Sequence, residues 1–208
     1  VTVMIVLDKL QKQYGRQNIL QKVSYTFANQ SRTVILGSNG SGKSTLIKIL
    51  SGALEASDNP PVFTIDSKEV SAKEIGLYLS IAAPYVALNP LFTLSETLLF
   101  HIKMCGFNPS FQIEEWLSRA DLLKHRDKRL ATFSSGMLQR VRLLLAIPSD
   151  RSLLLLDEPT SNLDKAGVLL YQELIARFTT DKTIIVASNY FTDEYSFCDQ
   201  ELLLEKHN

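Results

Sequence analysis

The spacing of apolar residues changes near residue 32 of the chain. Before that point, apolar and polar positions alternate along residues 1–10 and 19–28, and the turn-rich YGRQN lies between these two runs. Alternation with a period of two, bounded by turn residues, predicts two β-strands. We therefore expect the chain to begin with an antiparallel β subdomain.

Beyond residue 32, short apolar runs alternate with segments whose apolar residues recur at helical spacing. RTVILG at 32–37 predicts a strand, and KSTLIKILSG after it predicts a helix that ends at Gly52. VFTI, IGLYLSIAA before Pro84, SLLLLDEP and KTIIVAS predict further strands. Strands that alternate with helices favour right-handed crossovers and a parallel core sheet, so the predicted fold class is α/β.

Helical spacing dominates from about Thr93. LSETLLFHIKM and SFQIEEWLSRADLLKH predict the helices of a small inserted helical subdomain at about 93–130. Two later helices are predicted, one from Ser135 to about Ile147 and one from about Lys165 to Phe178.

These elements predict a single domain over residues 1–208. Residues 1–92 would form the β subdomain and the first part of the core, and residues 131–208 would complete the core after the helical insertion. We find no internal repeat and no low-complexity segment that would argue for a different organisation.

Composition and charge narrow the class of protein. The 22 basic and 22 acidic residues cancel, so no net charge draws the chain to nucleic acid, and no nucleic acid partner is expected. The longest apolar stretches, 143–147 and 153–156, are far shorter than the roughly 18 residues of a membrane span. The apolar start meets Asp8 without a basic region before it, so we expect an edge strand and not a signal peptide. Cys105 and Cys198 fit a reducing compartment.

The strongest chemical signal is GSNGSGKST, residues 37–45, which fits the pattern G-x-x-x-x-G-K-[ST] between a predicted strand and a predicted helix. Its glycines let backbone N–H groups point inward at the positive end of the helix dipole, where a triphosphate fits. Lys43 would reach the outer phosphates, Ser44 would hold Mg²⁺, and Thr45 would contact an inner phosphate. A glycine-rich turn without a ligand is the alternative. The predicted nucleotide-binding residues of the loop are Ser38, Asn39, Gly40, Ser41, Gly42, Lys43, Ser44 and Thr45.

A second part of the same site follows the leucine run in LLLLDEP. The run predicts a buried strand that delivers Asp157 and Glu158 to the edge of the sheet where α/β proteins bind ligands. Asp157 would bind Mg²⁺, directly or through a water, and Glu158 could polarise the attacking water as a general base. On its own the pattern could be a strand that leaves the core into a turn, an alternative that the phosphate-loop motif weakens.

The order of these motifs resembles the nucleotide-binding domains of ATP-binding cassette (ABC) transporters over essentially the whole chain. The shared motifs are an A-loop aromatic, Walker A, the signature, Walker B and the D-loop, at Tyr14, 37–45, 134–137, 153–158 and 161–164. The resemblance implies an ABC ATPase fold with a P-loop core, and ATP and Mg²⁺ as ligands. It also implies that Tyr14 stacks on adenine. The alternative for this residue is an exposed hairpin tyrosine.

The signature residues raise the question of which nucleotide they contact. In the family the signature turn opens a helix that faces the γ-phosphate held by the opposite subunit, so the resemblance implies a contact in trans. Hydroxyl and backbone donors at a helix N-terminus suit an anion, although a simple serine N-cap is the alternative. We expect ATP to join two cassettes, with a homodimer as the expected form. The residues assigned to this contact are Ser134, Ser135, Gly136 and Met137, and Asp164 is assigned separately as a residue of the D-loop.

Two departures from the family pattern fall on catalytic switches. Where relatives carry a glutamine after a strand, this chain has Ala82, Ala83 and Pro84, without a side-chain amide. Where relatives carry a histidine, it has Asn189, which can donate to a γ-phosphate but cannot hold positive charge. Losing one transition-state donor costs on the order of 10²–10³ in rate, so we expect ATP binding to persist and hydrolysis to be slow or partner-dependent. The predicted catalytic residues are Lys43, Glu158 and Asn189.

Two functional classes follow. The first is the ATPase subunit of an ABC transporter, which dimerises around Mg-ATP and drives a separate transmembrane permease from the cytoplasmic face of the membrane. Its contact with the permease is expected near residues 82–96. The second is a slow nucleotide-gated clamp or a non-transport ABC ATPase, and ATP turnover with and without a permease distinguishes the two. A small-molecule P-loop kinase has no need for SSGMLQR ahead of the Asp-Glu pair. The sequence is silent on the transported substrate and on its direction.

Overall fold

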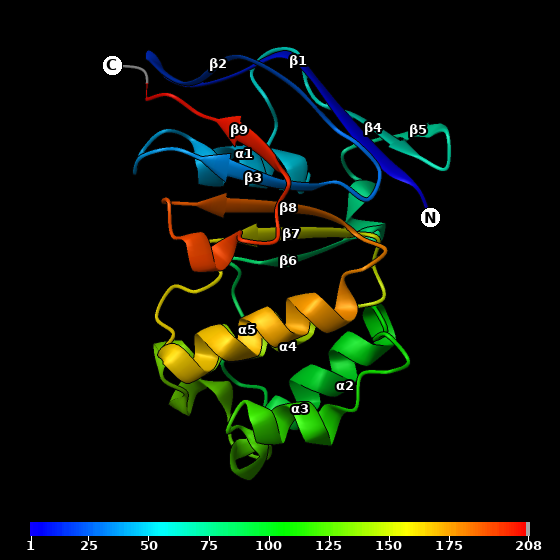
Figure 1. The fold of residues 1–208 in the computed structure, drawn as a ribbon, viewed down its shortest axis with the longest axis vertical. Helices are drawn as coiled ribbons and strands as arrows, with labels where there is room; N and C mark the ends of the chain where they lie inside the picture. The colour runs from blue at the N-terminus through cyan, green and yellow to red at the C-terminus, as the bar shows by residue number, and fades with distance from the viewer. Residues whose placement is uncertain (207–208) are drawn as a thin grey trace. The chain divides into compact units, whose positions relative to one another are not determined.

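The computed structural model describes residues 1–206, and the chain divides into two compact units, each built from segments that are far apart in the sequence (Figure 1). Unit 1 comprises Val1–Ser80, Arg151–Glu158 and the chain from Asp181 on, and unit 2 comprises Ile81–Asp150 and Pro159–Thr180. The expected helical subdomain falls within unit 2, and its bounds, like those of the other subdomains, stay a prediction.

Unit 1 contains one complete β-sheet and most of a second, whose strand β6 extends past the unit boundary at Ser80. The first has the strand order β2-β1-β4-β5 with antiparallel pairing, and the second has the order β6-β7-β8-β3-β9. The strands of the first sheet are β1 (Val3–Tyr14), β2 (Gln17–Phe27), β4 (Val62–Ile65) and β5 (Lys68–Val70). Those of the second are β3 (Arg32–Leu36), β6 (Leu79–Ala82), β7 (Leu153–Asp157), β8 (Thr183–Ser188) and β9 (Gln200–Leu203).

The sequence patterns of these strands match their surroundings. In β1, Val3, Ile5 and Leu7 are buried while Met4 between them is exposed, as the alternation predicts for a sheet with one covered face. All residues of β7 and β8 are buried, which explains their unbroken apolar runs. The pairs β7–β8, β8–β3 and β3–β9 are parallel, as predicted for the core sheet.

The sequence reading of this unit was wrong in one segment and incomplete in another. A strand was expected to begin at Ile75, but Ile75–Leu77 forms a short 3-10 helix, η1, because the N–H groups of Glu74 and Ile75 bond to the Ser71 carbonyl and start a turn. The strand β5 was not predicted. It pairs with β4 across Asp66 and Ser67, which both have positive φ and close a two-residue hairpin turn.

The helices of unit 2 follow the predicted pattern in most of their length. Helix α5 has its predicted bounds, and α4 ends one residue before the predicted Ile147. The run 110–125 is not continuously helical, because Asp121 has positive φ and separates a short helix from a 3-10 turn. The elements are α2 (Leu94–Met104), α3 (Ile113–Arg119), η2 (Leu123–His125), η3 (Leu130–Thr132), α4 (Ser135–Ala146) and α5 (Lys165–Phe178). In unit 1 the corresponding elements are α1 (Lys43–Leu50), η1 (Ile75–Leu77) and η4 (Thr192–Glu194).

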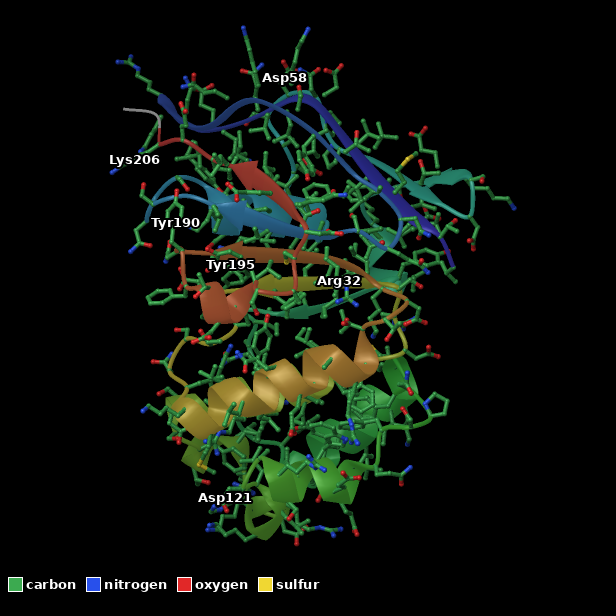
Figure 2. All side chains as sticks on the ribbon, in the orientation of Figure 1. Arg32, Asp58, Asp121, Tyr190, Tyr195 and Lys206 are labelled. Carbon is green, nitrogen blue, oxygen red and sulfur yellow. The ribbon has the colours of Figure 1, made fainter. Side chains whose placement is uncertain are left out.

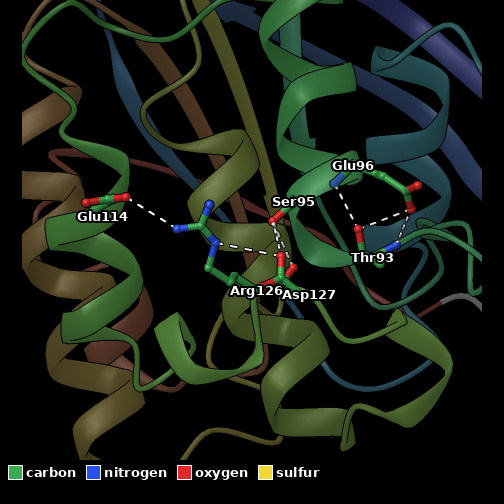
Figure 3. Close-up of polar contacts among 6 residues, drawn as sticks. All are labelled: Thr93, Ser95, Glu96, Glu114, Arg126 and Asp127. Atoms are coloured by element: carbon green, nitrogen blue, oxygen red, sulfur yellow. Dashed lines mark hydrogen bonds and ion pairs between the residues drawn. The ribbon is translucent and has the colours of Figure 1, made fainter.

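Two features stabilise the structure of unit 2, namely aromatic packing between its helices and a capping box at the start of α2. The rings of Phe111 and Trp116 lie 5.5 Å and 5.3 Å from that of Phe178 in edge-to-face contacts, so α3 and α5 share one apolar core. Thr93 and Glu96 form a reciprocal capping box at the start of α2 (Figure 3).

Hydrogen bonds to the loop at residues 126–127 also hold the start of α2 in place. The backbone N–H of Ser95 donates to the Arg126 carbonyl at 2.8 Å, and its hydroxyl donates to the same oxygen and to Asp127. Arg126 in turn contacts Glu114 of α3, as Figure 3 shows. The helices α2 and α3 are thereby tied to one loop within the unit.

Candidate active site

The parallel sheet brings three separate segments to one edge. Strand β8 lies between β3 and β7 (Figure 1), and the register pairs Leu36 with Ser188 and Ala187 with Asp157. All three strands therefore end together. The phosphate loop follows β3, Glu158 follows β7 and Asn189 follows β8, at the carboxyl edge where open α/β sheets bind ligands.

The phosphate loop leads directly into α1, as predicted. Gly42 is the N-cap of this helix and has φ 98°, a left-handed conformation that favours glycine. A Cβ at this position would also lie 2.7 Å from Leu20 Cδ2 and 3.0 Å from the Ile19 carbonyl. Any other residue would therefore displace the loop from β2. Helix α1 packs on β7 and β8, which fixes the direction of its N-terminus and of its dipole.

Lys43 is buried at the start of this helix, with 5% of its surface exposed. Its ammonium group donates to the carbonyls of Gly37 at 2.6 Å and Ser38 at 3.1 Å, and to Asn189 Oδ1 at 2.6 Å. Burial lowers the pKa of Lys43 below its usual value, although the nearby charges of Glu158, then Asp157, oppose that shift. The side chain is thus held at the mouth of the loop, where an outer phosphate would meet it.

Asn189 also contacts the residue predicted to be the general base. Its Nδ2 donates to Glu158 Oε1 at 2.5 Å. Glu158 has φ 46°, an uncommon conformation for a non-glycine residue, and its backbone N–H bonds to the Ala187 carbonyl at 2.9 Å. The three predicted catalytic residues, Lys43, Glu158 and Asn189, are therefore in one hydrogen-bonded cluster.

A cleft of about 220 Å³ opens beside this cluster in unit 1. Ile19 of β2 also lines the cleft and was not predicted as a site residue, because a single apolar residue in a strand carries no chemical signal. The lining residues are Ile19, Asn39, Gly40, Gly42, Lys43, Ser44, Thr45 and Glu158. Six of the predicted loop residues thus face one space, while Ser41 is buried and Ser38 is exposed.

The donor set fits a magnesium ion that is bound mainly by its substrate. Asp157 is 1% exposed at the end of β7, and the half-buried Ser44 supplies a hydroxyl one residue after Lys43. Among residues 1–206, no group of three or more histidine, cysteine, aspartate or glutamate side chains could hold a metal by itself. One carboxylate and one hydroxyl are nevertheless what Mg²⁺ uses when phosphates and waters complete its coordination.

Tyr14 lies at the end of β1, before the hairpin turn to β2, and is 50% exposed. The Lys12 ammonium lies 5.0 Å from the centre of its ring, so one face already carries a cation–π contact. Tyr14 is not among the described residues that line the 220 Å³ cleft. Stacking on adenine stays a prediction for this residue.

The signature motif forms a second cleft, of about 400 Å³, within unit 2. Ser134 caps α4, since its hydroxyl accepts the Met137 N–H at 3.2 Å, while Ser135 is exposed at the first helical position. A Cβ at Gly136 would lie 2.9 Å from the Asn162 carbonyl, so the signature turn and the D-loop touch through backbone. The lining residues are Ser134, Ser135, Gly136, Met137, Arg140, Asn162, Leu163 and Asp164.

Arg140 joins the signature helix to the D-loop, a contact that the sequence analysis did not predict. Its guanidinium contacts Asp164 Oδ1 at 2.6 Å and donates to the Ala120 carbonyl at 2.9 Å. Asp164 also caps α5 by accepting the Gly167 N–H at 2.8 Å. That backbone bond, followed by the Arg140 bond, lowers the pKa of Asp164.

The segment at the end of β6 and just after it consists of Ala82, Ala83 and Pro84. Ala82 and Ala83 are fully buried, and Pro84 follows them at an exposed position. The residues there are small and apolar, so no side-chain amide is available at the place where the resemblance implies one.

Comparisons with known proteins agree with this arrangement. The family described as ABC transporter matches residues 20–161, more than half of the chain. The linearmycin resistance ATP-binding protein LnrL of Bacillus subtilis (strain 168) is 29% identical over 95% of this chain and 65% of its own length. The ABC transporter ATP-binding protein YybJ of the same strain is 30% identical over 94% and 90%, and the lantibiotic transport protein SrtF of Streptococcus pyogenes is 28% identical over 92% and 82%.

Solved structures share the fold. The dimeric structure of the bacterial ABC transporter cassette MJ0796 has a TM-score of 0.79 at 22% identity, with 97% of this chain and 94% of that chain covered. A post-hydrolysis structure of the same cassette bound to ADP and Pi has a TM-score of 0.76 at 20% identity, covering 97% and 94%. At these identities the likeness shows the fold alone, and it confirms the predicted fold class.

The fold and the loop together define a P-loop nucleotide-binding protein. More narrowly, the chain belongs to the ABC transporter family, as one of its ATP-binding cassettes. It spans about two thirds of the length of the first relatives that it matches. Within residues 1–206, no helix is both long and apolar enough to cross a membrane.

Proposed function

We propose that the protein binds Mg-ATP in the cleft beside Lys43, hydrolyses it, and does so as one of two cassettes that drive a separate transmembrane permease. The observation that carries this proposal is the cluster of Lys43, Asn189 and Glu158 at the common edge of β3, β8 and β7. Three strand ends bring a phosphate-binding cation, a neutral amide and a carboxylate into one hydrogen-bonded cluster, and Lys43 and Glu158 of this cluster line the cleft.

Each residue has a distinct role in this proposal. Lys43 and the N–H groups at the start of α1 hold the phosphates, and Thr45 contacts an inner phosphate. Ser44 and Asp157 would hold the metal ion, which neutralises charge on the phosphates when it is bound. Glu158 accepts a proton from the attacking water as the general base.

A second cassette is proposed because the residues that line the signature cleft, at 134–140 and 162–164, are far in sequence from the phosphate loop at 37–45. Ser135 and Gly136 stand at the N-terminus of α4, a position that favours an anion, and the signature cleft contains no lysine. A γ-phosphate held by a second copy would supply that anion. The dimeric structure of the cassette MJ0796 supports this arrangement by analogy of fold.

The permease partner is supported by an apolar surface in unit 2. Several large apolar side chains are exposed between residues 85 and 104, a range that overlaps the predicted contact region 82–96. Among them the rings of Phe92 and Phe100 lie 6.4 Å apart, and neighbouring exposed apolar side chains favour an interaction surface. They are Tyr85, Leu91, Phe92, Leu99, Phe100, Ile102 and Met104. Contact with a permease would place the protein at the cytoplasmic face of a membrane.

Glu158→Gln tests the proposed function. The variant keeps the shape of the cleft but removes the general base, so we expect hydrolysis to fall by about 10²–10⁴ and Mg-ATP to accumulate between two cassettes. Sedimentation velocity in saturating Mg-ATP should show a dimer, and in ADP a monomer. A monomer in both nucleotides would contradict the composite site.

A slow nucleotide-gated clamp is the second candidate, and a specific observation favours it. Asn189 is bonded to both Lys43 and Glu158, and its neutral amide cannot exchange a proton as a histidine would. Phosphate release measured with and without the permease in lipid separates the two functions. A transporter subunit accelerates when the permease is added, whereas a clamp stays slow.

A further inference from the structure

Strand order places Asn189 between two groups of opposite charge. Because β8 is flanked by β3 and β7, the residue after β8 lies between Lys43, which follows the β3 loop, and Glu158, which follows β7. Its short side chain reaches both, at 2.6 Å and 2.5 Å. Asn189 is thus the link between the phosphate-binding cation and the predicted general base.

Chemistry fixes which way this amide points. An ammonium group can only donate and an ionised carboxylate can only accept, so the Asn189 carbonyl oxygen must face Lys43 and its NH₂ group must face Glu158. The reversed amide would set donor against donor and acceptor against acceptor. The two partners therefore determine which way the Asn189 amide faces, so the assignment of its oxygen and nitrogen is not arbitrary.

Lys43 has no further hydrogen to offer in this state. Its ammonium group carries three N–H donors, and three acceptors take them: the carbonyls of Gly37 and Ser38 and Asn189 Oδ1. A phosphate oxygen that binds Lys43 must therefore replace at least one of them. Asn189 is the one acceptor of the three that belongs to a side chain, so it can move without moving the loop.

We propose that Asn189 is a positioning residue whose amide turns over when a terminal phosphate reaches Lys43, and that this turn releases Glu158. The proposal rests on the proposed function. After the turn, the NH₂ group faces the phosphate as a donor and Oδ1 faces Glu158. Two acceptors cannot share a hydrogen bond, so the Glu158 carboxylate loses its tie to Asn189 and is available to the attacking water. ADP can replace an acceptor of Lys43 with its β-phosphate, but it has no terminal phosphate to accept a hydrogen bond from the turned NH₂ group. The Asn189–Glu158 bond therefore stays in place with ADP.

The backbone around Asn189 is held, so that the side chain is the moving part. Before it, Ser188 Oγ donates to the buried Glu194 at 2.5 Å, and the Phe191 N–H donates back to Ser188 Oγ at 3.3 Å. After it, Tyr190 turns the chain with φ 64° and is exposed (Figure 2). On the other side, Glu158 has a left-handed backbone whose N–H is bonded to the Ala187 carbonyl. Once Asn189 has turned, the Glu158 side chain has lost its bond to Asn189 and can change direction.

A double-mutant cycle on nucleotide binding tests the proposal. The quantity measured by titration calorimetry is the affinity for the non-hydrolysable ATP analogue AMPPNP divided by that for ADP, both with Mg²⁺. Glu158→Ala removes the acceptor that holds the Asn189 amide. This substitution should raise the ratio about tenfold more when residue 189 is asparagine than when it is already alanine, as expected for a hydrogen bond to a charged group. Glu158→Gln offers a donor as well as an acceptor, so residue 158 can bond Asn189 in either orientation of the amide. This variant should also raise the ratio, and again only when residue 189 is asparagine.

A second readout does not involve affinity. In ¹⁵N-labelled protein the side-chain NH₂ signal of Asn189, assigned by its loss in Asn189→Asp, should shift with AMPPNP and stay in place with ADP. Equal effects of Glu158→Ala in both backgrounds, or equal shifts with both nucleotides, would overturn the amide turn while leaving ATP binding intact. If the wild type bound neither nucleotide, the proposed function itself would fall.

Discussion

The phosphate-loop cleft of unit 1 and the signature cleft of unit 2 differ in how their polar groups are satisfied. In the first, Lys43 is buried and donates three hydrogen bonds to groups of the same chain, and Asn189 carries the connection on to Glu158. In the second, Ser135 stands exposed at the N-terminus of α4. The phosphate-loop cleft must break bonds of Lys43 to bind a ligand. In the signature cleft Ser134 and Arg140 are also bonded within the chain, but Ser135 is already exposed to a ligand.

This difference suggests a division of work between the two clefts. The first can discriminate between ligands, because only a group able to replace an internal acceptor enters the network. The second can add affinity with little reorganisation, because its donors are preset at a helix N-terminus. A composite site made of both would couple recognition in one cassette to closure by the other.

Complementation gives the largest expected effect. Lys43→Ala should abolish nucleotide binding, and Ser135→Glu should block closure by repelling a γ-phosphate, so each variant alone should lose about 10²-fold or more in ATP turnover. A mixture of the two variants can form one intact composite site per heterodimer and should regain measurable phosphate release. If phosphate release by the mixture stays as low as that of the separate variants, the two clefts do not work in trans.

A binding control sharpens that result. Ser135→Glu alone should bind ADP with wild-type affinity, because the substitution lies outside the phosphate-loop cleft. Loss of ADP binding in this variant would mean that its effect reaches the fold and not only the dimer.

Arg140→Lys should have an intermediate effect. Lysine keeps the charge but cannot reach Asp164 and the Ala120 carbonyl with one planar fork, so the signature turn and the D-loop lose their shared anchor. We expect ATP turnover to fall several-fold with unchanged ADP affinity. Arg126→Lys, at an exposed pair with Glu114 in the same unit, is the matched control and should leave turnover unaltered.

Glu96→Gln should have the smallest effect, and it depends on pH. The Thr93 N–H lowers the pKa of Glu96 below its usual 4.5, so the carboxylate contributes stability above that value and loses it as pH falls through the lowered pKa. Glutamine keeps the capping box without titrating. The difference in melting temperature between wild type and Glu96→Gln should therefore shrink as the pH is lowered from about 6 through the lowered pKa of Glu96. A difference that stays constant with pH would contradict this origin.

The predictable parts of the fold were those that local patterns control. Helix α5 begins and ends where its apolar spacing placed it, because Asp164 supplies a cap just before the helix. The 3-10 turn at Ile75–Leu77 and the hairpin at Asp66 and Ser67 were missed. Both depend on backbone conformations that apolar spacing does not report.

The candidate site was predictable as a set of residues but not as a network. Lys43 and Glu158 are recognisable from their neighbours in sequence, whereas Asn189 was identified only through the family resemblance, at the position where relatives carry a histidine. Their bonds join residues 146 and 31 positions apart. The contact of Arg140 with Asp164 likewise spans two helices and had no sequence signal.

The sequence by itself determined that this chain carries a phosphate loop, a paired carboxylate motif and a signature turn, because each is written in consecutive residues whose local conformation follows from glycine, lysine and capping chemistry. Only the tertiary structure decided that β8 lies between β3 and β7. That order sets a single amide between a cation and a carboxylate, and it arises from sheet packing over the whole chain, which no short stretch of residues specifies.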